Sequence, residues 1–263
     1  ILEQLEKKQQ TQGPEVLRVE QLYYVPPMHV PLVQNVSFSL HGGEILGIAG
    51  VSGNGQSELA EILAGLRPPT SGNIFLNGQE VAAWPPRVLT NAGVAHIPEK
   101  RQEMGIVMDF PLHENAMLGA FFRLPFSKQG LLQQKQTQRY TQNLLLTYSV
   151  RAKDVNVIMH ELSGGNQQKF VVGRELERHP AVLLAIQPTR GVDIGSTEFI
   201  HRQLLEQRER GVAILLISTE LDEIFALSDR IAVMYQGKFV GIVPVEKANR
   251  ETIGLMMAGA AQT

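Results

Sequence analysis

Apolar and polar positions along the chain predict strands of two kinds. Val16 to Leu22 and Val36 to Leu40 alternate apolar with polar residues, which is typical of half-buried strands. Residues 44–49 (EILGIA), 181–186 (AVLLAI) and 212–218 (VAILLIS) are almost continuously apolar. Such runs are typical of strands that are buried on both faces of a sheet.

Helical periodicity is found next to these buried strands. Residues 56–66 place Leu59, Ile62 and Leu63 on one face, and residues 196–208 have a helical pattern between the last two buried strands. Strand, helix and strand in alternation predict a parallel sheet covered on both faces. The expected fold class is therefore α/β.

Two further segments have patterns of their own. Residues 111–160 contain Gln-rich helical stretches such as 130–148 and no clear buried strand, so we expect a helical insertion there. Two apolar runs within 231–243 flank Gln236 and Gly237, which predicts a hairpin. Residues 1–15 are rich in Gln, Lys and Glu, which favours a linker to a preceding domain over an ordinary N-terminal tail.

Composition narrows the class of protein. The chain has 263 residues, of which 43% are hydrophobic and 19% charged, so it can bury a large core. Its net charge of −2 provides no general basic surface, and we expect no nucleic-acid partner. The absence of cysteine excludes disulfides and thiolate metal sites. No apolar run approaches the roughly 18 residues of a membrane-spanning helix, so we expect a soluble protein or a soluble part of one.

A glycine-rich loop follows the first buried strand. Residues 50–57, GVSGNGQS, have the spacing of the phosphate-binding motif G-x-x-x-x-G-K-[S/T], with Gln56 at the lysine position. Backbone N–H groups and a helix N-terminus cradle phosphates in such a loop, and the lysine reaches the β- and γ-phosphates. The candidate nucleotide-binding residues are Gly50, Val51, Ser52, Gly53, Asn54, Gly55, Gln56, Ser57 and Glu58.

A second motif, LSGGNQQK, occupies residues 162–169. A serine and two glycines at the start of a helix offer a hydroxyl and unobstructed N–H groups to an anion. Such a tripeptide is common in loops, but here it accompanies the glycine loop and the run QPTRGVD at 187–193. With these motifs the chain resembles the nucleotide-binding domains of ATP-binding cassette (ABC) transporters, whose signature is LSGG.

Three runs point to one group within this family: PEKR (98–101), PTRGVD (188–193) and IGLMMAG (253–259). These runs are similar to the second, C-terminal cassette of double-cassette sugar and nucleoside importers. The resemblance implies a P-loop NTPase (RecA-like) core with an antiparallel β subdomain and an inserted α-helical subdomain at about 111–165. It implies one nucleotide-binding domain over 16–263, with 1–15 as the interdomain linker.

Four positions depart from the family pattern. Gln56 replaces the lysine, Ile186 and Gln187 replace the aspartate and glutamate that serve Mg²⁺ and the attacking water, and Thr219 replaces the switch histidine. Ser57 is left as a weak candidate ligand for Mg²⁺. We therefore expect ATP and Mg²⁺ to bind weakly or not at all at this loop, and the domain alone to have little or no ATPase activity.

Three residues near these motifs have two interpretations each. Glu99 and Glu220 are either substitute bases or, more simply, solvated carboxylates. Arg190 either contacts a phosphate or the interface between cassettes, or it forms a structural ion pair.

The LSGG signature is intact in this sequence. In the family, two cassettes pack head to tail, so that each ATP lies between the glycine loop of one cassette and the signature of the other. The resemblance implies that this signature completes the ATP site of an upstream cassette of the same polypeptide; a scaffold cassette that binds no nucleotide is the alternative. The signature residues are Leu162, Ser163, Gly164, Gly165, Asn166 and Gln167. The family also implies that the interface loop, residues 187–193, crosses to the partner at Asp193, which fits a helix N-cap equally well.

The family also implies transmembrane permease subunits as partners. Residues 104–115 lie where the family docks its permease, and Met108 and Phe110 suit a partner groove, although packing under the helical insertion would use them equally well. The expected location is cytoplasmic, peripheral on the inner face of the cell membrane.

Overall fold

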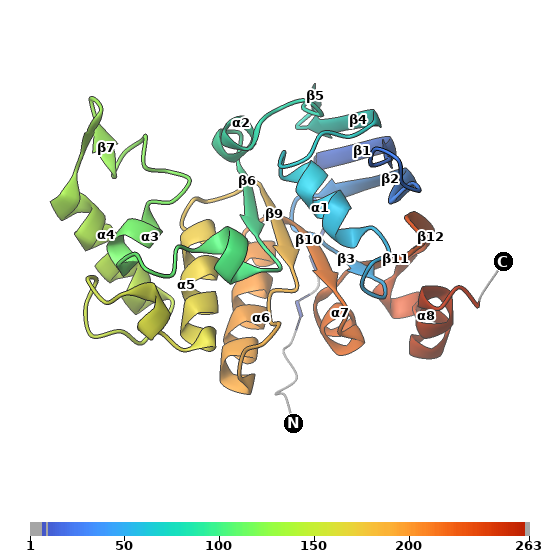
Figure 1. Ribbon diagram of the computed structural model, residues 1–263. Coiled ribbons are helices and arrows are strands. Elements are labelled where there is room, and N and C mark those ends of the chain that lie inside the picture. The colour runs from blue at the N-terminus through green and yellow to red at the C-terminus, as the bar shows by residue number, and fades with distance from the viewer. Residues whose placement is uncertain (1–6, 9, 261–263) are drawn as a thin grey trace.

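The continuously apolar runs form the middle of a six-stranded sheet (Figure 1). The computed structural model describes residues 7–8 and 10–260, and in it the strand order is β12-β11-β3-β10-β9-β6. The strands are β3 (Ile45–Ala49), β6 (Val94–Ile97), β9 (Val182–Ile186), β10 (Ala213–Ser218), β11 (Arg230–Tyr235) and β12 (Lys238–Pro244). All pairs are parallel except that of β11 with β12. The predicted α/β core is confirmed.

Side chains of the central strands alternate between two hydrophobic clusters. Ile45 packs in one cluster, whereas Leu46 and Ile48 pack in the other. The first cluster is covered by α5 (Gly164–Leu176), α6 (Ile194–Glu209) and α7 (Leu221–Leu227). The second is covered by α1 (Gln56–Leu63), by α2 (Pro86–Asn91) and by an antiparallel sheet. Burial on both faces explains why these strands are apolar throughout.

The antiparallel sheet contains the alternating strands of the sequence. Its order is β2-β1-β4-β5, with β1 (Glu15–Tyr24), β2 (Val33–His41), β4 (Ser71–Leu76) and β5 (Gln79–Glu80). Alternation is clear in β2, where Val36, Phe38 and Leu40 are buried and the residues between them are not. The β subdomain that the resemblance implies is therefore present, and it extends the predicted strands to β4 and β5.

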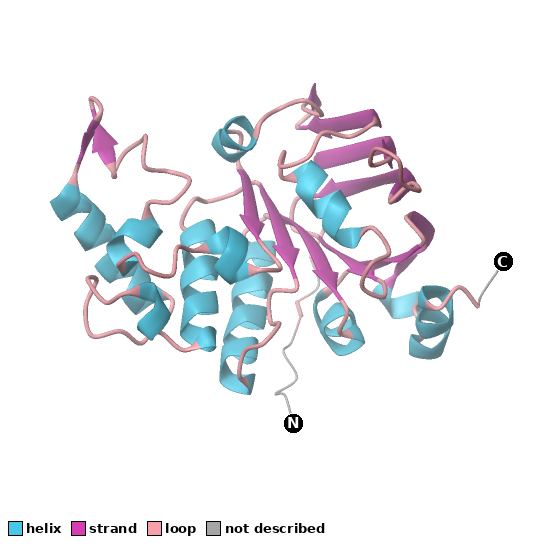
Figure 2. Ribbon diagram, in the orientation of Figure 1, coloured by secondary structure: helices cyan, strands magenta, loops and turns pink. Residues whose placement is uncertain are grey.

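The insertion at 111–160 is mainly helical and projects from one end of the central sheet (Figure 2). It contains α3 (Leu112–Ala116) and α4 (Gln134–Thr147). A short hairpin of β7 (Ser127–Lys128) and β8 (Leu131–Leu132), which the pattern did not predict, also belongs to it. Short helical turns flank the insertion, a π-helical turn at Arg101–Gly105 and a 3₁₀ turn at Met159–Glu161.

The remaining elements lie near the two ends of the chain. The predicted hairpin is formed by β11 and β12, whose turn residues Gln236 and Gly237 both have positive φ. A 3₁₀ turn (Val245–Lys247) leads to α8 (Arg250–Met257). The expected linker at 1–15 lies partly outside the described residues, and its last residue, Glu15, already belongs to β1. Within the described part, no helix is both long and apolar enough to cross a membrane.

Candidate functional site

The glycine loop connects β3 to α1, which is the strand-loop-helix order that its motif requires. Gly53 and Gly55 have φ values of +89° and +99°, in the left-handed region that glycine adopts readily. A Cβ on Gly55 would collide with the carbonyl oxygen of Leu32. The backbone therefore fixes the shape of the loop independently of the missing lysine.

Gln56 turns back into the loop. Its Nε2 donates to the carbonyl of Val51 at 3.1 Å, and its Oε1 accepts a hydrogen bond from the N–H of Asn54 at 3.1 Å. The side chain is buried, with 6% exposure. A neutral amide thus takes up one N–H group of the loop. Among residues 7–8 and 10–260, by contrast, no acceptor contacts the N–H groups of Gly53 and Gly55, so part of the cradle is free.

The four degenerate positions lie together. Gln56, Ile186, Gln187 and Thr219 line one small hollow of about 30 Å³, at the carboxyl ends of β3, β9 and β10. Gln187 Oε1 accepts hydrogen bonds from the N–H and the Oγ1 of Thr219, both at 3.3 Å. A hollow of this volume can hold a water molecule. At these four positions it is lined by an apolar side chain, two amides and a hydroxyl.

The same place offers little to a metal ion. Ser57 Oγ donates to Glu99 Oε2 at 3.1 Å, and Glu99 Oε1 pairs with Arg190. In the described part of the chain no three or more His, Cys, Asp or Glu side chains form a metal-binding group. The residues fit a partial phosphate cradle, and Ser57 and Glu99 are the oxygen-bearing side chains nearest to it that could face an ion held mainly by waters and phosphates.

The ion pair bears on the interpretations left open for Glu99 and Arg190. Both oxygens of Glu99 are engaged, one by Ser57 and one by Arg190, so this carboxylate is not a free base. Arg190 has the structural ion pair that was one of its two alternatives. Glu220 is exposed and lies outside the hollow. Sequence reasoning did not identify the Ser57–Glu99–Arg190 contact, because its members are 42 and 91 positions apart.

The signature forms the start of α5. Ser163 is the N-cap residue, and its exposed Oγ accepts hydrogen bonds from the N–H of Asn166 at 3.4 Å and from its Nδ2 at 3.0 Å. Leu162 and Gln167 are buried, and Gln167 Nε2 donates to the carbonyl of Leu162 at 3.1 Å. The buried side chains therefore hold the start of α5 against the core, and Ser163 and Gly164 lie at the surface.

The interface loop packs against the signature. Asp193 caps α6, since its Oδ1 accepts from the N–H of Ser196 at 2.9 Å and its Oδ2 from the hydroxyl at 2.8 Å. These hydrogen bonds hold the pKa of the Asp193 carboxyl below its usual range. A Cβ on Gly165 would collide with both Asp193 and Ser196. The N-cap expected at Asp193 is thus present, and a glycine is required where the two segments meet.

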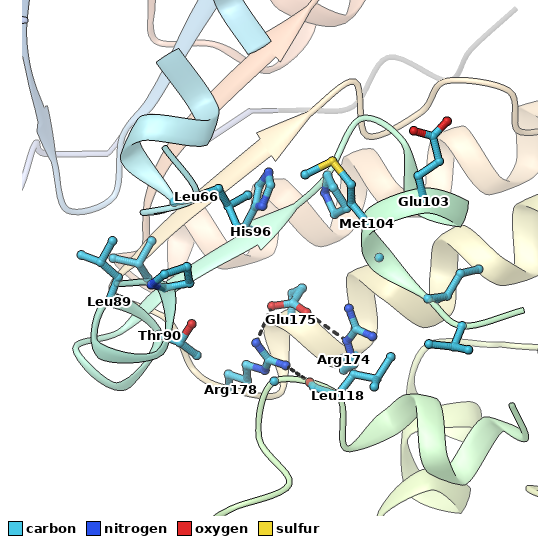
Figure 3. Close-up of a pocket in the computed structure, with 18 residues that line it drawn as sticks. Leu66, Leu89, Thr90, His96, Glu103, Met104, Leu118, Arg174, Glu175 and Arg178 are labelled. Atoms are coloured by element: carbon cyan, nitrogen blue, oxygen red, sulfur yellow. Dashed lines mark hydrogen bonds and ion pairs between the residues drawn. The ribbon is translucent and has the colours of Figure 1, made fainter. Parts of the chain in front are cut away.

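A larger hollow of about 420 Å³ lies between α2, β6, the π-helical turn and α5 (Figure 3). Glu175 lies between Arg174 and Arg178, at 3.0 and 2.9 Å, and faces His96 and Met104 across the hollow. Burial lowers the pKa of His96, and the attraction of Glu175 and Glu61 only partly opposes it.

Residues of the segment 104–115 are divided between surface and core. Met104 and Val107 line the large hollow, and Phe110 has 42% exposure. Met108 packs instead against the core cluster, with its sulfur 4.0 Å from Gln167 Nε2. Core packing therefore holds for Met108, whereas the docking role of the exposed residues stays a prediction.

Comparison with known proteins gives the family. The ABC transporter model matches residues 33–190. The chain is 44% identical over 257 residues to the guanosine import ATP-binding protein NupO of Bacillus subtilis, covering 98% of this chain and 50% of that protein. It is 40% identical over 227 residues to the nucleoside import ATP-binding protein NupA of Lactococcus lactis, covering 86% of this chain and 45% of that protein. The chain thus spans about half the length of these relatives.

Solved structures confirm the P-loop NTPase fold. A nucleotide-free ATP-binding cassette from an ABC transporter has a TM-score of 0.76 at 21% identity, covering 92% of this chain and 95% of that one. A dimeric post-hydrolysis state of the cassette MJ0796 bound to ADP and Pi has a TM-score of 0.74 at 19% identity, covering 87% and 98%. The match to the family model over residues 33–190 and the identity to these relatives show that the chain belongs to the ABC transporter family.

Proposed function

We propose that this chain is the second cassette of a double-cassette importer for sugars or nucleosides, and that its signature completes the ATP site of an upstream cassette of the same polypeptide. The relatives named above import guanosine and nucleosides, and the chain spans about half of each. The observation that carries the proposal is a contrast between two sites. The glycine loop is occupied by the amide of Gln56, whereas Ser163 is exposed at the start of α5.

The chain's own loop contributes little to hydrolysis in this account. Loss of one charged phosphate contact costs about 1.5–3 kcal/mol of binding, or roughly one to two decades in affinity. An incoming phosphate must also displace the hydrogen bond between Gln56 and Asn54. Neither Ile186 nor the amide of Gln187 can accept the proton of an attacking water. Weak binding without turnover is therefore the expected behaviour of this loop.

The signature side retains what a substrate phosphate needs. α5 extends over Gly164–Leu176, so its N-terminus carries the positive end of a helix dipole together with free N–H groups. The hydroxyl of Ser163 lies at that end. These groups suit the negative charge that develops on a transferred phosphoryl group, and they act across the interface rather than on this chain's own loop.

We also infer that a transmembrane permease docks at the hollow lined by Met104 and Val107, which places the chain on the inner face of the membrane. Its lining includes the apolar side chains of Met104, Ile106 and Val107, and Phe110, three positions further along the chain, is exposed. Glu175, which also lines the hollow, is held by ion pairs with two arginines. A hollow of this kind, with exposed apolar side chains in the same segment of the chain, suits the insertion of a short helix from a partner.

A scaffold cassette that holds no nucleotide is the second candidate, because Gln56 already occupies part of the loop. Isothermal calorimetry of MgATP on the 263-residue chain separates the two. Detectable affinity without turnover supports a degenerate nucleotide site. Absence of binding at millimolar ATP supports the scaffold and overturns the proposal for this loop.

A further inference from the structure

Arg101 lies between the signature and the interface loop. Its Nη1 donates to the carbonyl of Arg190 at 3.2 Å, and its Nε donates to Gln167 Oε1 at 3.5 Å. Its Nη2 is so close to Gly164 that an added Cβ there would lie only 2.8 Å away. One guanidinium therefore contacts both segments that the proposed function brings to the neighbouring ATP.

The backbone around Arg101 has an unusual local structure. Arg101 opens the π-helical turn that follows β6, and its carbonyl accepts from the N–H of Ile106 at 2.9 Å. Such turns are rare and are frequent at functional sites. The next residue, Gln102, also donates to Gln167 Oε1, at 3.3 Å. The turn thus directs two consecutive side chains at the same buried signature residue.

Arg101 differs from the nearby cations in its ion pairing with carboxylates. Lys100 pairs with Glu103 at 3.2 Å, and Arg190 pairs with Glu99. Among residues 7–8 and 10–260, no carboxylate forms an ion pair with Arg101. Partial burial lowers the pKa of its guanidinium. A half-buried cation without a carboxylate is costly, so its place beside the positive end of α5 indicates a role beyond local stability.

We propose that Arg101 is a positioning residue for the ATP site completed by the signature. Its planar fork ties Gln167 and Gly164 of the signature to the carbonyl of Arg190 in the interface loop. The side chain of Arg190 pairs in turn with Glu99, which accepts from Ser57, so this chain's own loop is connected to its signature through side chains and the backbone of Arg190. The proposal rests on the proposed function, because it requires the signature to face the neighbour's ATP.

Lysine cannot replace this arginine in the tie. The guanidinium offers several donors in a rigid fork, whereas an ammonium on a flexible stem is a point charge. Arg101→Lys therefore keeps the charge and loses the simultaneous contact with both segments. Arg101→Met loses both. Lys100→Met is the matched control, because Lys100 is the adjacent cation and its ammonium pairs with Glu103.

The test is steady-state ATPase of the full polypeptide with its permease. We expect Arg101→Met and Arg101→Lys each to lower kcat by about tenfold or more with little change in KM, since small misplacements of a catalytic group cost up to about a hundredfold. Lys100→Met is expected to leave kcat unchanged. A normal kcat for Arg101→Lys, or equal losses for Arg101→Met and Lys100→Met, overturns the positioning role.

Two further measurements keep the outcome clear. Thermal unfolding of each variant shows whether a loss of rate is only a loss of folded protein, and Arg101→Gln replaces the methionine variant if that variant is unstable. Ser163→Ala is measured in the same preparation. If Ser163→Ala leaves the rate unchanged, the proposed function fails. If Ser163→Ala inactivates and Arg101→Lys does not, only the role of Arg101 fails.

Discussion

The side-chain oxygen of Gln56 accepts a hydrogen bond from the backbone N–H of Asn54 at 3.1 Å, inside the loop whose N–H groups would face a phosphate. The residue that replaces the lysine thus does more than remove a charge. It fills the place of a ligand atom and satisfies a donor that a phosphate would otherwise bind. A loop of correct shape is therefore compatible with weak binding.

Restoring the cation should restore affinity but not turnover. Gln56→Lys removes the internal amide and returns a charged contact, so we expect MgATP to bind about ten times more tightly to the 263-residue chain, as measured by calorimetry. Gln56→Ala, which only empties the loop, separates the two effects. Because Ile186 and Gln187 are unchanged, ATP hydrolysis by either variant should stay at the background level. An unchanged affinity in Gln56→Lys would mean that the lysine is not what the loop lacks.

The contact between Gly165 and the interface loop predicts a stability difference between two glycine variants. Gly165→Ala places a Cβ against Asp193 and Ser196, and we expect a loss of about 1–3 kcal/mol in the free energy of unfolding. Gly254→Ala, in the middle of α8, meets no atom within 4 Å. This control should gain up to about 1 kcal/mol. Urea unfolding of both variants checks the contrast, and equal changes would contradict it.

His96 predicts how stability depends on pH. Burial holds its folded pKa below the ordinary value of 6.5, so the unfolded chain takes up a proton at higher pH than the folded chain does. The stability that His96 contributes is complete above pH 6.5 and is lost as the pH falls below that value. The free energy of unfolding of His96→Gln should therefore fall less between pH 7.5 and pH 5.5 than that of the unchanged chain.

The control for this measurement is His29→Gln, at an exposed position of the β1–β2 loop. It should leave the pH dependence of stability unchanged. A slope that is the same in His96→Gln and in the unchanged chain would show that other groups govern acid destabilisation.

The exposed Phe110 of the proposed docking segment predicts a loss of permease binding. Phe110→Glu puts a charge on an exposed apolar residue, and we expect the permease to dissociate while calorimetric MgATP binding by the cassette is unchanged. Leu146→Glu, at an exposed position of α4 with 70% exposure, is the control. Co-purification of the full transporter provides the measurement. Equal retention of permease by both variants would place the docking surface elsewhere.

Periodicity identified the elements with long apolar runs or a regular helical pattern. The apolar runs of β3, β9 and β10, the hairpin of β11 and β12, and the helix α6 follow directly from the sequence. The strand β6 was missed, because it has four residues and includes His96, so its apolar run is too short and broken. β4 was missed for a similar reason, since only Ile74 and Leu76 of its six residues are buried.

The resemblance to the family predicted which residues approach the glycine loop but not how they contact one another. Ile186, Gln187 and Thr219 follow strands of one parallel sheet, whose carboxyl ends meet at one edge, so their convergence with Gln56 was predictable. The inward turn of Gln56 was not, because it depends on a rotamer. The position of Arg101 was also hidden, since Gln167 is 66 positions away and only tertiary packing joins them.

Two serines provide the most direct test of the division between the two sites. Ser57 belongs to this chain's own loop and Ser163 to its signature, and both are exposed. We predict that Ser163→Ala lowers the steady-state ATPase rate of the full polypeptide at least tenfold, whereas Ser57→Ala leaves the rate within about twofold. A large loss in Ser57→Ala together with a normal rate in Ser163→Ala would contradict the account.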